Sequence, residues 1–374
     1  MKKIFIPICT LILLATSAYA TEPTSNPIVT AVPALSITPD ARSGGMGDIG
    51  AATTPDANSQ FWNPAKYVFM ESEAGLSVNY TPWLRKLVSD IDLTAISGYY
   101  KFDQNQSVSA SIRYFSLGDI QMTDYSGSPL YTAKPNEYSI DIAYSRLFSD
   151  KFSGAATLRY IRTDLGNGTQ TDEMTAGSTV AADIAAYYKT PVTLETLNGN
   201  LALGLNISNL GGKISYSEGE SYFIPTNMKL GASFEYPIDQ YNKLSISGDA
   251  NKLLVPTPDP TKEASYYFSM SPITGIMKSF SDAPGGAKEE LQEITWSLGA
   301  EYCYNNQFFV RGGYFHESQY KGNRKYFTAG AGFKLNIFQL DAGYVISVAQ
   351  SNPLDQTLRL SLSFDLFGLK NLVK

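Results

Sequence analysis

Apolar residues alternate with small or polar residues over most of the chain after residue 75. In the stretch SVSASIRYF, the residues of the apolar face are Val108, Ala110, Ile112 and Tyr114. Successive side chains of a β-strand point to opposite faces, so a period of two predicts a strand with one apolar face. The same period returns at 228–234, 294–302 and 358–366. The chain is therefore predicted to consist mainly of strands.

Connections between these segments alternate between short and long. Tight turns are predicted at DQNQ, SDK, PIDQ, NNQ and Asn336, whereas GDIQMTDYSGSPLYTAK, GNGTQTDEMTA, GGKISYSEGESYF and residues 254–288 form long connections. Outer-membrane barrels have short turns on the periplasmic side and long loops outside. About fourteen strands are predicted, roughly at 75–83, 91–102, 105–118, 135–148, 151–164, 177–189, 199–210, 225–236, 241–253, 289–304, 307–317, 324–335, 337–349 and 354–366.

Composition favours a membrane barrel over a soluble β-protein. A soluble β-sandwich or propeller also alternates, but its outer face should be rich in Lys, Glu and Thr. Here the less apolar face carries Ser, Gly, Ala, Thr and scattered charge, and charged residues make up only 17% of the chain. We predict an all-β fold: a transmembrane antiparallel outer-membrane β-barrel of about fourteen strands with an N-terminal hatch or plug segment. An even strand number places both termini in the periplasm and the long loops outside the cell.

The first twenty residues have the features of a secretory signal peptide. Lys2 and Lys3 precede an apolar stretch at 4–14, and Ala18-Tyr19-Ala20 is a small-residue cleavage site. The predicted division is 1–20 signal peptide, 21–74 N-terminal periplasmic or hatch segment, and 75–374 barrel. Without the two signal lysines the net charge is −8, and this moderate acidity argues against a nucleic-acid partner.

The stretch GGMGDIG at 44–50 matches the G-x-G-x-x-G of dinucleotide-binding loops. Its context does not fit, because a Pro-Asp turn precedes it in place of a buried strand, and Pro55 interrupts any following helix. Glycines also let one backbone pass close to another, as a packed plug requires. The candidate hatch residues are Gly44, Gly45, Gly47, Gly50, Asn63 and Pro64.

No arrangement of residues supports catalysis. The chain has no G-x-S-x-G motif, and its single histidine, His316, is predicted at the outer end of a strand. Cys303, which remains after the signal is removed, is predicted to be a small residue facing the lumen. Asp119 and Asp124 lack the spacing of a calcium loop. We expect no enzymatic activity, no metal and no cofactor.

The largest loop, 254–288, is unusually apolar for a segment predicted to lie outside the membrane. Ile273, Ile276, Met277 and Phe280 have helical spacing, and an exposed apolar patch of this size usually marks an interaction surface. Alternatively, the loop folds into the barrel mouth and closes it. The candidate partner-binding residues in the extracellular loops are Trp83, Leu84, Leu87, Tyr131, Tyr266, Tyr267, Phe268, Ile273, Ile276, Met277 and Phe280.

The stretch at 39–69, PDARSGGMGDIGAATTPDANSQFWNPAKYVF, resembles the N-terminal hatch of the FadL-like barrel superfamily, which shares a G-M-G, a later Asp and an N-P-A pattern. Within that superfamily, YTPWLRKLVSDIDL, RYFSLGDI, SDAPGGAKEELQEITWSLGAEY and KGNRKYFTAGAGFK are similar to the PorV family of the type IX secretion system.

This resemblance implies a non-enzymatic shuttle in the outer membrane of a Gram-negative bacterium. Its implied partners are outer-membrane lipid, the translocon barrel, the C-terminal domains of cargo proteins and a sortase-like attachment complex. The alternative function is FadL-like transport of hydrophobic small molecules, which would need an apolar path through the lumen. A general porin is a weaker alternative, because a packed N-terminal segment does not suit an open channel.

Overall fold

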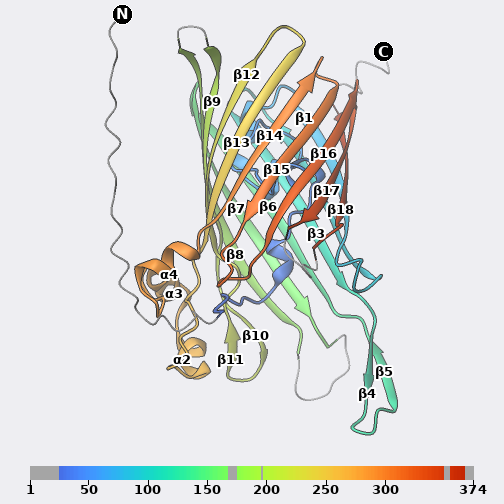
Figure 1. Ribbon diagram of the computed structural model, residues 1–374, viewed down its shortest axis with the longest axis vertical. Coiled ribbons are helices and arrows are strands. Elements are labelled where there is room, and N and C mark those ends of the chain that lie inside the picture. The colour runs from blue at the N-terminus through green and yellow to red at the C-terminus, as the bar shows by residue number, and fades with distance from the viewer. Residues whose placement is uncertain (1–24, 167–174, 195–196, 349–353, 367–374) are drawn as a thin grey trace, which may run out of the picture.

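The computed structural model describes residues 25–166, 175–194, 197–348 and 354–366. Fourteen antiparallel strands form a closed barrel in which β1 pairs with β18 (Figure 1), which confirms the predicted fold class. The barrel strands are β1 (Ala74–Pro82), β2 (Ile91–Lys101), β3 (Gln106–Leu117), β6 (Asn136–Ser149), β7 (Phe152–Asp164), β8 (Gly177–Leu194), β9 (Leu197–Gly211), β12 (Asn227–Pro237), β13 (Asn242–Leu253), β14 (Thr295–Tyr304), β15 (Phe308–His316), β16 (Lys325–Leu335), β17 (Phe338–Ser347) and β18 (Leu358–Asp365).

The predicted alternation separates the two faces of the barrel wall. Along β14, Leu298 and Tyr302 are exposed on the outside, whereas Ser297 and Glu301 are buried toward the lumen. Aromatic side chains gather near both ends of the outer wall, where membrane barrels carry aromatic girdles. The ring pairs in contact are Tyr100–Phe102, Phe148–Phe152 and Phe308–Phe333 near the short turns, and Tyr138–Tyr160, Trp296–Tyr314 and Tyr314–Phe327 near the long connections.

Short turns and long connections lie at opposite ends of the barrel (Figure 1). The tight NNQ turn between β14 and β15 uses Asn305 and Asn306, both with a φ of 54°, a conformation that asparagine tolerates better than most residues. Among the residues that the structure describes, the long connections carry two hairpins and three helices: β4 (Ile120–Thr123) with β5 (Pro129–Ala133), β10 (Ile214–Ser217) with β11 (Glu220–Tyr222), and α2 (Ala264–Ser269), α3 (Pro272–Lys278) and α4 (Ala287–Gln292).

The prediction of one strand over 289–304 was wrong at its start. Residues Ala287–Gln292 form α4, and β14 begins only at Thr295. Glu289 and Glu290 lie in the first helical turn, where negative charge is favoured by the helix dipole. Both carboxylates also form ion pairs with lysines of the barrel end, so tertiary contacts favour the helix.

The N-terminal segment runs through the inside of the barrel. We call residues 25–30 the arm and residues 31–73 the plug, which contains η1 (Pro33–Ser36), α1 (Ala41–Gly44), η2 (Ser59–Phe61) and η3 (Pro64–Phe69). The arm lies at the long-loop end, since the Asn26 N–H donates to the carbonyl of Tyr320 at 2.7 Å. The plug leads from there to Ala74, at the short-turn end.

The two ends of the described chain therefore lie at opposite ends of the barrel. Asn26 is at the long-loop end, whereas Asp365 closes β18 at the short-turn end. The prediction that both termini lie in the periplasm concerns residues 1–24 and 367–374, which lie outside the described residues. Among the helices of the described residues, none has the length and apolar character needed to cross a membrane.

Candidate functional site

The GGMGDIG segment of the plug packs against the inner barrel wall. Gly47 has a φ of 80°, which favours glycine, and a Cβ on it would meet the backbone of Tyr314 at 2.9 Å. A Cβ on Gly50 would overlap the ring of Trp62, and one on Gly44 would overlap the Arg359 side chain. Gly45 lies against Gly330, where a Cβ would be 3.0 Å from the opposite Cα. The segment thus serves backbone packing, with no phosphate-binding helix after it.

Glycines on the wall meet the plug in cross-strand pairs. The three pairs are Gly204–Gly231, Gly299–Gly313 and Gly330–Gly343. A Cβ on Gly204 would lie 2.0 Å from the carbonyl oxygen of Ala51, and one on Gly343 would lie 2.6 Å from that of Ala41. Sequence analysis missed these positions. Their only sequence signal is a glycine at the lumen-facing position of a strand.

Asn63 and Pro64 fix the second half of the plug. The Asn63 side-chain oxygen accepts a hydrogen bond from the Ala65 N–H at 3.1 Å and caps η3, while Pro64 occupies the first helical position. The Asn63 amide also donates to the carbonyls of Ala51 and Ala186, both at 2.9 Å. One side chain thereby joins two parts of the plug and strand β8.

Buried ion pairs connect the plug to the wall. Arg42 donates to both carboxylate oxygens of Glu301 on β14, at 3.0 and 2.8 Å, and to Asp56 at 2.8 Å. The buried guanidinium of Arg42 thus lies between two carboxylates, one from the wall and one from the plug. Asp48, also in the plug, accepts from Arg359 at 2.6 Å. These contacts hold the plug on two sides of the lumen.

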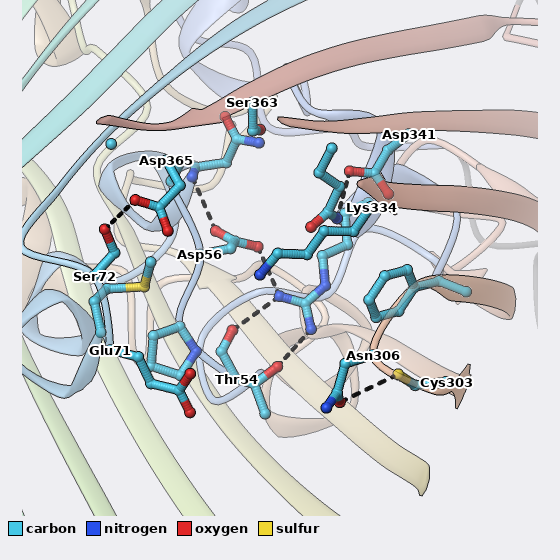
Figure 2. Close-up of a pocket in the computed structure, with 18 of the residues that line it drawn as sticks. Thr54, Asp56, Glu71, Ser72, Cys303, Asn306, Lys334, Asp341, Ser363 and Asp365 are labelled. Carbon is cyan, nitrogen blue, oxygen red and sulfur yellow. Dashed lines mark hydrogen bonds and ion pairs between the residues drawn. The ribbon is translucent and has the colours of Figure 1, made fainter. Parts of the chain in front are cut away.

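A cavity of about 400 Å³ lies between the plug and the short-turn end of the barrel. Figure 2 shows Asp56 and Thr54 of the plug beside Lys334, Asp341 and Asp365 of the wall. Its other charged lining residues are Arg42, Glu71, Lys189, Glu235, Lys243 and Glu301. So polar a lining does not provide the apolar path that FadL-like transport of hydrophobic molecules would need.

The two residues considered for chemistry lie far apart in the barrel. Cys303 is buried and lines the short-turn cavity, with its Sγ 3.9 Å from Asn306 Oδ1 (Figure 2). His316 lies at the long-loop end of β15, and its ring stacks on Trp296 with 4.8 Å between centroids. Among the described residues, no three His, Cys, Asp or Glu side chains are grouped as metal ligands.

The predicted contact residues of the largest loop divide into an exposed and an anchoring set. Ile273 is 76% exposed and Met277 69% exposed, and Phe280 is also exposed. Leu291 of α4, which sequence analysis did not single out, is 70% exposed. We call these four residues the outer apolar surface. Their exposure costs hydration free energy unless a partner covers them.

The anchoring set holds α2 within its own connection and against the hairpin β10–β11. The Tyr267 hydroxyl accepts from the Asp259 N–H at 2.7 Å, and the Phe268 ring lies 5.2 Å from that of Tyr222. Tyr266 stacks edge-on against Tyr267 at 5.2 Å. Ile276 is half-buried. These four side chains therefore support the outer apolar surface more than they extend it.

The remaining predicted contact residues lie on other loops. Trp83 is partly buried against Leu93 and Phe115 on one side and against Phe315 on the other, and Leu84 packs beside it. Leu87 is exposed, and Tyr131 is half-buried on β5. The indole thus joins two core clusters and has a packing role.

Helix α4 is fixed by a charge cluster whose strength depends on pH. Lys321 donates to Glu289 at 2.6 Å, and Lys252 donates to Glu293 at 2.6 Å. Burial opposes ionisation of Glu289, but hydrogen bonds from Lys321, Gly285 and Asn26 outweigh it and hold the pKa of Glu289 below its ordinary value.

Acidification is therefore expected to loosen α4. A depressed pKa gives stability that is present above the unfolded value, roughly 4.3 for glutamate, and is lost as pH falls through the lower folded value. Hydrogen exchange of α4 amides, corrected for intrinsic rates, should stay slow at about pH 6 and accelerate below about pH 4. Glu289→Gln should flatten this dependence. An equally steep dependence in the variant would assign it to another group.

The fold and the site together define a plugged outer-membrane β-barrel. Its outer wall is apolar between two aromatic belts, its lumen is filled by its own N-terminal segment, and its long-loop face exposes apolar helices. The chain belongs to the PorV family, because the family model described as "Type IX secretion system protein PorV" matches residues 20–260. It is therefore an outer-membrane component of type IX secretion.

Solved structures show the same barrel at low sequence identity. The toluene transporter TodX of Pseudomonas putida superimposes with a TM-score of 0.50 and 12% identity, covering 86% of this chain and 96% of TodX. A Pseudomonas aeruginosa FadL homologue gives 0.47 and 13%, covering 92% of this chain and all of the homologue. At these identities the likeness concerns the fold alone. No protein of the curated collection matches the chain.

Proposed function

We propose that this protein is a non-enzymatic carrier that binds the C-terminal domain of cargo proteins as the type IX translocon releases them. It then passes them to a sortase-like complex that attaches them to the cell surface. Membership of the PorV family supports a role in this pathway. The observation that carries the proposal is the outer apolar surface, formed by Ile273, Met277, Phe280 and Leu291 at the long-loop end.

Orientation in the membrane follows the general rule for such barrels. Short turns lie in the periplasm and long loops outside the cell, so α3 and α4 face the surroundings of the cell. The lumen is closed by the plug, whose contacts include the buried Arg42–Glu301 pair. Cargo is accordingly bound at the outer face, without passing through this barrel.

The role of the outer apolar surface in cargo binding can be tested by placing negative charges on it. Ile273→Asp combined with Met277→Asp should lower the affinity for an isolated cargo C-terminal domain at least about tenfold, because two exposed apolar anchors are lost. Leu130→Asp is the matched control, since Leu130 is equally apolar and exposed on hairpin β4–β5. Binding is measured with the purified barrels in detergent, after a heat-dependent gel shift has shown that each is folded.

Two outcomes would contradict the proposal. Undiminished cargo binding by the folded double variant would remove the outer apolar surface from the site. A deletion strain with normal cargo secretion and attachment would remove the carrier function itself. Equal losses in the double variant and in Leu130→Asp would indicate a general effect of charge at the long-loop end.

A further inference from the structure

The arm is held at the outer end of the barrel by three hydrogen bonds from one residue. The Asn26 N–H donates to Tyr320 O at 2.7 Å, and its side-chain amide donates to Pro258 O at 2.9 Å and to Glu289 Oε1 at 3.0 Å. Tyr320 belongs to the β15–β16 connection, and the other two acceptors belong to the connection that carries α2–α4. A single asparagine thus joins two separate connections.

The same Glu289 oxygen belongs to the charge cluster under α4. Lys321 donates to Glu289 Oε1 at 2.6 Å and to Glu293 at 3.1 Å, and Lys252 donates to Glu290 at 3.0 Å. The Glu290 carboxylate in turn accepts from the Ala283 N–H at 2.9 Å. Asn26 therefore enters a network that fixes both ends of the segment between α3 and β14.

Beyond Asn26 the arm continues directly into the plug. The Ala31 N–H donates to Phe223 O at 2.9 Å, and Ala31 and Val32 are buried with Ile161 and Ile214 under the long-loop mouth. The Phe223 ring also lies against Gly275 of α3, where an added Cβ would be 2.6 Å from it. The arm thus connects the plug with the helices that carry the outer apolar surface.

We infer that the arm is a strap on the outer face of the membrane that locks α3 and α4 to the plug through Asn26. This inference rests on the proposed function, because it makes the arm a regulator of the cargo-binding site. While Asn26 keeps its three contacts, the outer apolar surface stays fixed; release of Asn26 lets α4 move away from the barrel end. The chain consequently passes through its own barrel and presents its arm outside the cell.

The side of the membrane is tested by cysteine labelling. Val29 is 78% exposed on the arm, whereas Cys303 is buried in the lumen. Val29→Cys should react with a membrane-impermeant maleimide on intact cells. Gln104→Cys, in the exposed β2–β3 turn at the other end, should react only after the outer membrane is permeabilised. Labelling of Gln104→Cys alone on intact cells overturns the inference.

The strap itself is tested by placing a charge on the arm. Asn26→Asp sets a carboxylate against Glu289 and should accelerate hydrogen exchange of α4 amides about tenfold, with the barrel strands unaffected. Ser25→Asp adds the same charge one residue away, at an exposed position, and should leave exchange unchanged. Unaltered exchange in folded Asn26→Asp, or equal acceleration in both variants, overturns the strap.

The effect of the strap on cargo binding is tested by a separate measurement. Asn26→Asp should weaken binding of the cargo C-terminal domain several-fold relative to Ser25→Asp, because the released surface must be ordered again on binding. Faster exchange with unchanged cargo affinity overturns the regulation. If the unsubstituted barrel binds no cargo domain, the proposed function fails and the regulation with it, whereas the exchange experiment still decides whether the strap exists.

Discussion

Replacing Gly313 with alanine is expected to destabilise the protein strongly, although it adds a single methyl group. The new Cβ would lie 2.1 Å from the carbonyl carbon of Met46 and 2.3 Å from the Gly47 nitrogen. These are backbone atoms of the plug, and the strand on the other side is paired with both neighbours. Neither side can yield easily, so we expect a loss near or above about 3 kcal/mol, the upper end for overpacking.

Gly312→Ala is the matched control for this substitution. Gly312 is the preceding residue of β15 and faces outward, and the nearest atom to an added Cβ is Thr328 O at 3.9 Å. Its effect should stay within about 0.5 kcal/mol. The temperature of the gel shift from folded to unfolded barrel, with limited proteolysis of the plug, compares the two. Similar behaviour of both variants would show that the plug adapts to the wall.

Glu301→Gln should have a comparably large effect through charge. Glu301 accepts from Arg311 Nε at 2.6 Å and from Arg42 at 2.8 and 3.0 Å. The glutamine amide carries no negative charge, so two buried guanidiniums in the lumen lose the carboxylate that they share. Arg311 still forms an ion pair with Asp341, and Arg42 with Asp56. Breaking a buried pair in this way costs about 3–5 kcal/mol.

Glu235→Gln provides the comparison, because Glu235 lines the same cavity. It has no ion pair among the described residues, and its hydrogen bond from Asn200 is long, at 3.4 Å. The unfolding midpoint in urea should fall markedly for Glu301→Gln and little for Glu235→Gln. A small effect of Glu301→Gln would mean that water or rearranged neighbours satisfy both arginines.

The barrel could be predicted because the sequence of each strand reflects the two environments that its two faces contact. Lipid on one side and the lumen on the other impose the period of two, as Leu298 and Ser297 show. Turn residues such as Asn305 and Asn306 indicated where the strands end. Glycines in GGMGDIG pointed to close packing because their surroundings ruled out a helix.

What could not be predicted depends on contacts between distant parts of the chain. Arg42 and Glu301 are 259 residues apart, and the pairing of Gly299 with Gly313 matters only once the plug lies across them. Trp83 looked like an exposed loop aromatic, but it fills the gap between two core clusters. The position of Asn26 also followed from neither periodicity nor composition, since three acceptors from two loops define it.

The contact between β1 and β18 has a consequence for biogenesis. This pair joins the first and last strands of the barrel, so it closes a longer stretch of chain than any other strand pair of the barrel. The plug precedes β1 and fills the lumen on which that pair closes. We therefore expect residues 31–73 to enter the lumen before this strand pair seals the wall.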